Sequence, residues 1–180
     1  MKKYVNNLSL VKLILLAILV ALGLVVGLFT IGTNVWQVSL SFVVNALLGA
    51  VGGVWAGLAM AVSDVIHSLF MSHYGYFPGF TFSAVVVGVL YGLFFYGKRL
   101  EVAKVRDWLY VLVAVAVIML VDTVFFNSLW VSMLYKLPFK VALVARLPLL
   151  VQIPARMIIL MLVLPALQCI KQVRELMGIK

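Results

Sequence analysis

The amino-acid sequence predicts an all-α integral membrane protein with six transmembrane helices and both termini in the cytoplasm. Three observations lead to this prediction: an apolar composition, apolar stretches of membrane-spanning length, and the positions of the basic residues. Of the 180 residues, 66% belong to the apolar set and 11% are charged, whereas a soluble domain is about half apolar and about a quarter charged. The mean hydropathy is +1.24. This composition excludes a disordered chain, a disulfide-rich secreted domain and almost any water-soluble enzyme.

Four apolar stretches are long enough to cross the hydrocarbon core, which is about 30 Å thick and needs about 20 residues of helix. The first, at 8–30, follows basic residues as a signal peptide would. We expect a retained helix, because the apolar run is too long for a signal peptide and no small-residue cleavage site follows it. The other three are at 80–97, 107–135 and 142–172, and the last two are long enough to be tilted.

The stretch between residues 37 and 70 needs a separate argument, because as one helix it would be about 50 Å long. Basic residues cluster at the N-terminus, at 98–106 and in the tail from residue 171. If all three clusters are cytoplasmic, an even number of spans separates the first from the second. The stretch therefore holds two helices, at 38–50 and 53–70. The turn between them is expected at Gly52 and Gly53, where helix propensity is lowest.

The charge balance points to the membrane and not to nucleic acid. The chain has 14 Lys and Arg against five Asp and Glu, which gives a net charge of +9. A basic excess can indicate nucleic-acid binding, but these residues stand at the ends of apolar stretches, as they do in cytoplasmic loops of membrane proteins. We expect the lipid bilayer as a partner and no nucleic acid.

Aromatic and polar side chains concentrate on the predicted outer side, in and beside the loops 30–37, 71–79 and 136–141. Taken singly, such aromatic residues are typical of an interfacial belt. Together with an amide and a guanidinium, they are typical of a pocket for a flat, acidic small molecule. The residues concerned are Trp36, Tyr74, Tyr76, Phe77, Phe80, Thr81, Asn127, Trp130, Tyr135 and Arg146.

Away from the ends of the predicted spans, four ionisable residues are candidates for a role inside the bilayer: Asp64, His67, Asp122 and Arg156. Such residues are costly in a bilayer and are functional candidates by default, the alternative being structural ion pairs or hydrogen bonds between helices. Asp64 and His67 share a helix face because they are three residues apart. The four do not form an obvious proton relay along the sequence.

Small residues recur at a spacing that lets helices approach closely in lipid. Most of them are expected to pack this protein against itself, whereas one such face on a peripheral helix would dock a partner subunit. The residues are Ala17 and Ala21 on one face of the first helix, Gly23 and Gly27 on nearly the opposite face, and then Gly49, Gly53, Gly57, Gly88 and Gly92.

The sequence contains no recognisable catalytic or metal-binding set. Residues 92–98 match the start of a phosphate-binding loop, but Arg99 stands where Ser or Thr must bind magnesium. The histidines, His67 and His73, and the single cysteine, Cys169, cannot complete a zinc site, and no nucleophile elbow occurs. We predict no catalytic residues, no metal and no cofactor in this chain, which is therefore not expected to be an enzyme.

Three segments carry a resemblance to a known family: residues 76–84 (YFPGFTFSA), 88–92 (GVLYG) and 127–130 (NSLW). They resemble the substrate-binding (S) subunits of energy-coupling factor (ECF) vitamin transporters, specifically the folate type. The pair Ala17 and Ala21 is similar to the small-residue face by which that family meets its transmembrane coupling (T) subunit. Size, six helices and cytoplasmic termini agree with the family, so the resemblance covers essentially the whole chain.

The resemblance implies a multi-pass protein of a prokaryotic plasma membrane that binds folate from outside with high affinity. It implies delivery by reorientation against the T subunit, with ATP used by two cytosolic ATPase subunits and not by this chain. Among the residues, it implies stacking on folate by Phe77, Phe80 and Trp130. It also implies polar contacts from Asn127 and Thr81, and a carboxylate bound by Arg146.

Two other functions remain open at this point. The first is an S subunit for another vitamin, such as pantothenate or a pyrimidine precursor. The second is a stand-alone secondary carrier, in which Asp64, Asp122 and Arg156 would couple transport to an ion. A structural membrane protein or a membrane enzyme is less compatible with outer aromatic residues that have no catalytic set beside them.

Overall fold

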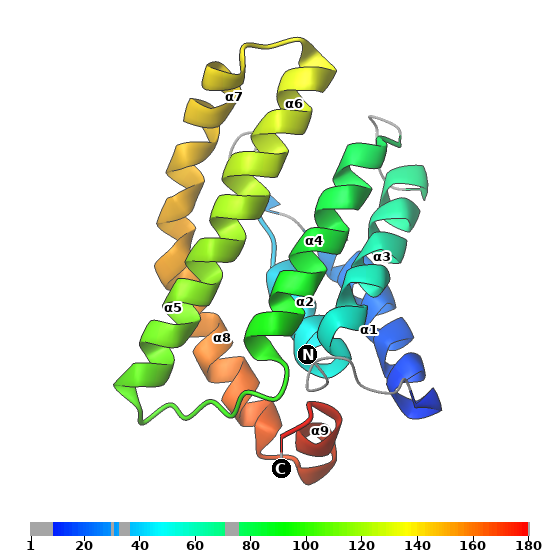
Figure 1. Ribbon diagram of the computed structural model, residues 1–180, viewed down its shortest axis with the longest axis vertical. Coiled ribbons are helices and arrows are strands. Elements are labelled where there is room, and N and C mark those ends of the chain that lie inside the picture. The colour runs from blue at the N-terminus through cyan, green and yellow to red at the C-terminus, as the bar shows by residue number, and fades with distance from the viewer. Residues whose placement is uncertain (1–8, 30, 33–36, 71–75, 180) are drawn as a thin grey trace.

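The computed structural model describes residues 9–29, 31–32, 37–70 and 76–179. In this part the regular elements are helices and two antiparallel strands of two residues each, which the sequence did not predict (Figure 1). The elements are α1 (Leu10–Leu28), β1 (Ile31–Gly32), β2 (Gln37–Val38), α2 (Ser41–Gly52), the 3-10 turn η1 (Gly53–Trp55), α3 (Ala56–Phe70), α4 (Pro78–Phe95), α5 (Val105–Met119), the π-helical segment η2 (Leu120–Phe126), α6 (Asn127–Tyr135), α7 (Phe139–Arg146), the 3-10 segment η3 (Leu147–Val151), α8 (Gln152–Gln168) and α9 (Lys171–Leu176).

The described residues contain five continuous helical stretches that are long and apolar enough to cross a membrane. This agrees with the multi-pass membrane protein that the composition predicts. The stretches are Leu10–Leu28, Ser41–Phe70, Pro78–Phe95, Val105–Tyr135 and Phe139–Gln168. The second stretch joins α2, η1 and α3 without a gap. It therefore contains both of the helices predicted at 38–50 and 53–70.

The chain nevertheless reverses within that stretch, at Gly53. Its φ is +57°, in the left-handed region that favours glycine. Phe42 near the start of α2 and His67 near the end of α3 line the same cavity, although in one straight helix they would lie about 37 Å apart. Residues 41–70 therefore form a helical hairpin whose bend includes Gly53, beside the turn position expected from the sequence.

Helix α4 packs against this hairpin with backbone touching backbone. A Cβ atom on Gly88 would lie 2.7 Å from the carbonyl oxygen of Ala56 and 2.7 Å from Cα of Gly57. A Cβ atom on Gly49 would lie 2.5 Å from the carbonyl carbon of Tyr91. No side chain fits at such distances, so these small residues pack the protein against itself, as the sequence spacing predicts.

The observed helix ends differ from the predicted ones where proline or an altered helix type intervenes. The predicted ends at residues 8 and 30 lie outside the described residues. α4 begins at Pro78 and not at residue 80, because proline is favoured in the first helical turn. The helix predicted at 142–172 begins earlier in the structure, at Phe139, and ends earlier, at Gln168. The chain is extended at Ile170 before α9.

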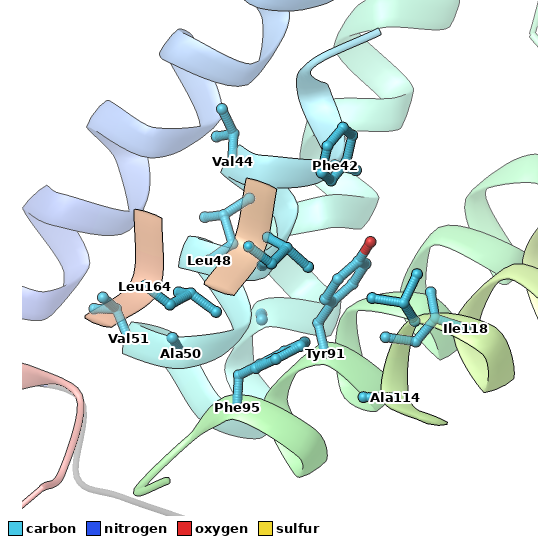
Figure 2. Close-up of a cluster of buried hydrophobic side chains, with 14 of the residues drawn as sticks. Phe42, Val44, Leu48, Ala50, Val51, Tyr91, Phe95, Ala114, Ile118 and Leu164 are labelled. Carbon is cyan, nitrogen blue, oxygen red and sulfur yellow. The ribbon is translucent and has the colours of Figure 1, made fainter. Parts of the chain in front are cut away.

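The core lies between α2, α4, α5 and α8. Figure 2 shows Tyr91 and Phe95 of α4 among Leu48 of α2, Ile118 of α5 and Leu164 of α8. The Tyr91 and Phe95 rings stack with centroids 6.0 Å apart. These residues belong to one buried hydrophobic cluster.

The end of the bundle at which α1 begins is closed by the C-terminal segment (Figure 1). Met177 is fully buried, and its carbonyl oxygen accepts a hydrogen bond of 2.8 Å from the backbone N–H of Gly97. The side chain of Gln168 accepts from the backbone N–H of Leu100 and donates to the carbonyl oxygen of Lys98, both at 3.0 Å. We call this group the α9 closure.

Candidate functional site

A cavity of about 440 Å³ lies where α1 and α3 end and α2 and α4 begin. Its volume is within the range of about 300–1,000 Å³ found for pockets that bind small molecules. Six elements contribute to the wall, namely α1, α2, α3, α4, η2 and α8, together with the residues just before α2. The polar residues of the wall are Ser39, Ser41, Asn45, Ser63, Asp64, His67, Ser83, Asp122, Thr123 and Arg156.

The four ionisable residues that the sequence analysis selected inside the bilayer all line this cavity. Asp64 and His67 come from α3, Asp122 from the π-helical segment η2, and Arg156 from α8. Since π-helical segments are frequent at functional sites, the position of Asp122 in one is consistent with a binding wall. The fold thus brings together residues that formed no recognisable set along the chain.

Asp64 is held by the neighbouring helix. Thr81 Oγ1 of α4 donates a hydrogen bond of 2.7 Å to Asp64 Oδ2, and the hydroxyl oxygen of Tyr76 lies 3.3 Å from Thr81 Oγ1. Thr81 itself is not part of the cavity wall. Its observed role is therefore to fix the carboxylate of Asp64.

Arg156 is held from two sides. Its Nη2 donates to Oε1 of Gln152 at 3.1 Å, one helical turn earlier on α8. Its guanidinium carbon lies 5.0 Å from the centroid of the Phe42 ring, a cation–π contact with α2. Its Nε is buried and has no hydrogen-bond partner among the described residues, as expected of a donor whose acceptor belongs to a ligand.

No acid of the cavity neutralises Arg156 directly. Within the described ranges, the side-chain ion pairs shorter than 4.0 Å join Glu101 to Arg99 and to Lys104, far from the cavity along the sequence. Asp64, Asp122 and Arg156 therefore present separate polar groups to the same cavity. Such a wall suits a ligand that carries both hydrogen-bond donors and acceptors.

An aromatic cluster adjoins the cavity, built from Phe77, Phe80, Phe126 and Trp130. The Phe77 ring meets those of Phe80 and Trp130 edge to face, with centroids 5.8 and 5.7 Å apart. Trp130 stacks on Phe126 at 6.2 Å with an interplanar angle of 9°. Phe80 also lines the cavity. Trp130 Nε1 is a buried donor with no partner in the part of the chain described.

The other predicted site residues are not among those that line the cavity. Asn127 begins α6 and Arg146 ends α7, and both are partly buried. Ala17 and Ala21 are exposed on α1, whereas Gly27, on the opposite face, lines the cavity. Trp36 and Tyr74 lie outside the described residues. The structure brings together the three predicted rings but places Arg156, and not Arg146, on the wall.

Sequence reasoning missed the contribution of α2. Phe42, Asn45 and Leu48 follow one another at three-residue intervals on one helix face and all line the cavity. Asn45 is the single amide in an otherwise apolar stretch. This amide among apolar residues could have indicated that α2 faces the cavity, because an amide within a span needs a hydrogen-bond partner or a polar space to face.

The known proteins to which this chain is similar carry the same name, FolT. No protein-family model matches the chain. It is 35% identical over 173 residues to the folate transporter FolT of Streptococcus mutans serotype c, covering 94% of this chain and 93% of the relative. It is 34% identical over 137 residues to FolT of Clostridium novyi, covering 75% and 76% of the two chains. A solved structure of FolT bound with folic acid matches with a TM-score of 0.73 and 27% identity, covering 86% of this chain and 91% of that one.

Proposed function

Since the chain belongs to the FolT family, the folate-type S components of ECF transporters, we propose that it binds folate from outside and delivers it for ATP-driven uptake. The observation that carries the proposal is the near-complete alignment with a folate transporter at 35% identity. The cavity of about 440 Å³ with its charged wall supports it. In this proposal the chain is a binding subunit and not an enzyme.

The distribution of charge in the cavity favours one orientation of folate. Asp122 and Arg156 lie near the middle of their spans, where burying the two carboxylates of the glutamate tail beside Asp122 would be costly. The neutral pterin ring instead offers N–H donors for a carboxylate and a carbonyl acceptor for a guanidinium. We therefore place the pterin ring between Asp122 and Arg156 and the glutamate toward the outer end.

In this proposal some of the predicted contact residues touch folate directly and others act through a neighbouring residue. Among the three predicted rings, Phe80 meets folate at the wall, and Phe77 and Trp130 support it through the cluster. Thr81 acts through Asp64, to which it is hydrogen-bonded. Asn127 and Arg146 are retained as contacts for the outer part of folate, Arg146 with a carboxylate.

The membrane topology in this proposal has six spans, with α2 and α3 crossing separately and both termini in the cytoplasm. The reversal at Gly53 supports it. So does the gathering of the start of α1 and of α9 at one end of the bundle (Figure 1). The exposed Ala17 and Ala21 on α1 offer a shallow, uncharged surface suited to reversible docking of a T subunit. Two cytosolic ATPase subunits supply the energy, so that ATP is used outside this chain.

Equilibrium binding to the purified protein in detergent tests the proposal. We expect calorimetry to give one tight folate site per chain and no heat from pantothenate or thiamine. Binding of another vitamin in place of folate would refute the assignment of the substrate. Uptake that continues after ATP depletion and follows an ion gradient would identify a secondary carrier and refute the coupling to ATPase subunits.

A further inference from the structure

An acidic and a basic side chain line the cavity without forming an ion pair with each other. Asp122 and Arg156 line the same space, yet within the described residues no ion pair of 4.0 Å or less joins them. At this depth in a membrane the effective dielectric constant is low, which strengthens the attraction between them. Something must therefore hold at least one of the two side chains in place.

The structure shows what holds the arginine. The oxygen Oε1 of Gln152 accepts from Nη2 of Arg156 at 3.1 Å, and the ring of Phe42 lies under the guanidinium at 5.0 Å. The two contacts come from different helices, α8 and α2, and so fix both the direction and the plane of the guanidinium. Phe42 lines the cavity, whereas Gln152 is not part of its wall.

We propose that Gln152 is a positioning residue that keeps Arg156 from collapsing onto Asp122, so that both charges remain available to the ligand. This inference rests on the proposed function, in which folate fills the space between the two side chains. Without Gln152, Arg156 turns toward Asp122 and forms an internal ion pair. That pair uses the donors and acceptors meant for the ligand and closes the deep end of the cavity.

The proposal predicts a kinetic signature. A collapsed fraction lowers the population that can bind, and the apparent affinity falls in proportion to that fraction. The loss therefore appears in the association rate constant, while the dissociation rate constant of the assembled complex is almost unchanged. A hydrogen bond to a charged group is strong enough to shift such an equilibrium by about tenfold or more.

Stopped-flow tryptophan fluorescence with folate measures both rate constants, each referred to the total folded protein so that a collapsed fraction is included. Gln152→Met keeps the length of the side chain but removes the acceptor, and we expect association to slow about tenfold with dissociation changed less than about twofold. Gln152→Glu keeps an oxygen acceptor and should restore most of the association rate. Gln172→Met, at an exposed glutamine of α9, is the matched control and should behave as the unmodified protein.

Two results would overturn the inference. Unchanged rate constants in Gln152→Met would show that Arg156 needs no support from Gln152. A change confined to dissociation would make Gln152 a direct contact of the ligand. Neither result touches the proposed function, which fails only if the unmodified protein does not bind folate.

Discussion

Replacing Gly88 by alanine should destabilise the protein, because α4 meets the α2–α3 hairpin there without room for a Cβ atom. The added carbon would lie 2.7 Å from the carbonyl oxygen of Ala56 and 2.7 Å from Cα of Gly57. Both are backbone atoms, so no side-chain rotation can relieve the contact. The two helices must move apart and lose their close packing.

The size of the effect follows from two opposing terms. Alanine is favoured over glycine within a helix by about 0.5–1 kcal/mol. Overpacking of a well-packed interior costs about 1–3 kcal/mol and occasionally more, and here it involves backbone, so we expect a net loss of about 1–2 kcal/mol. For a chain of this size, 1 kcal/mol corresponds to about 2–4 °C in Tm. Gly88→Ala should therefore lower Tm by about 2–8 °C.

Thermal unfolding of the purified protein, followed by tryptophan fluorescence, measures this change. Gly27→Ala is the matched control, because a Cβ atom on Gly27 would meet no atom of the neighbouring described residues within 4 Å. That variant should keep or slightly raise Tm. Equal melting temperatures for the two alanine variants would refute the argument that α4 and the hairpin require glycine where they touch.

Three further predictions concern the site, the docking surface and the α9 closure. Thr81→Val removes the 2.7 Å hydrogen bond to Asp64 and should weaken folate binding about tenfold by calorimetry, whereas Thr81→Ser should not. Ala17→Trp should abolish uptake in cells that hold the T and ATPase subunits, while folate binding to the purified chain persists. The control Val113→Trp, on the exposed face of α5, should leave uptake intact. Met177→Ala, at a fully buried side chain, should cost about 2–5 kcal/mol, and an unchanged Tm would contradict its place in the core.

The general architecture could be predicted because lipid imposes few choices. Spans must be apolar and long, and a chain has to reverse where helix propensity is lowest, which identified the vicinity of Gly53. Close backbone contact requires the smallest residues, so the glycines of α4 could be expected to face other helices. These inferences need only the chemistry of single residues and their spacing.

The walls of the site could not be predicted in the same way, because they depend on helix rotation. Arg146 and Arg156 belong to one helical stretch, but the 3-10 segment η3 lies between them and changes the number of residues per turn. Counting positions with the α-helical period therefore does not tell which arginine faces inward. The π-helical segment η2 has the same effect on the residues around it: Asp122, a candidate only because it is ionisable, lines the cavity, whereas the contact predicted for Asn127 stays a prediction.

The α9 closure limits how a molecule in the cavity can leave toward the end where α9 lies. A passage there would have to separate Gly97 from Met177, break the two hydrogen bonds of Gln168 and open the stacked rings of Tyr91 and Phe95. A transporter whose two halves rock around a fixed site needs, on each side of that site, an interface between the halves that separates easily. In this bundle the contacts on one side include part of the hydrophobic core, which supports the proposed reorientation of the whole protein over the opening of an inner gate.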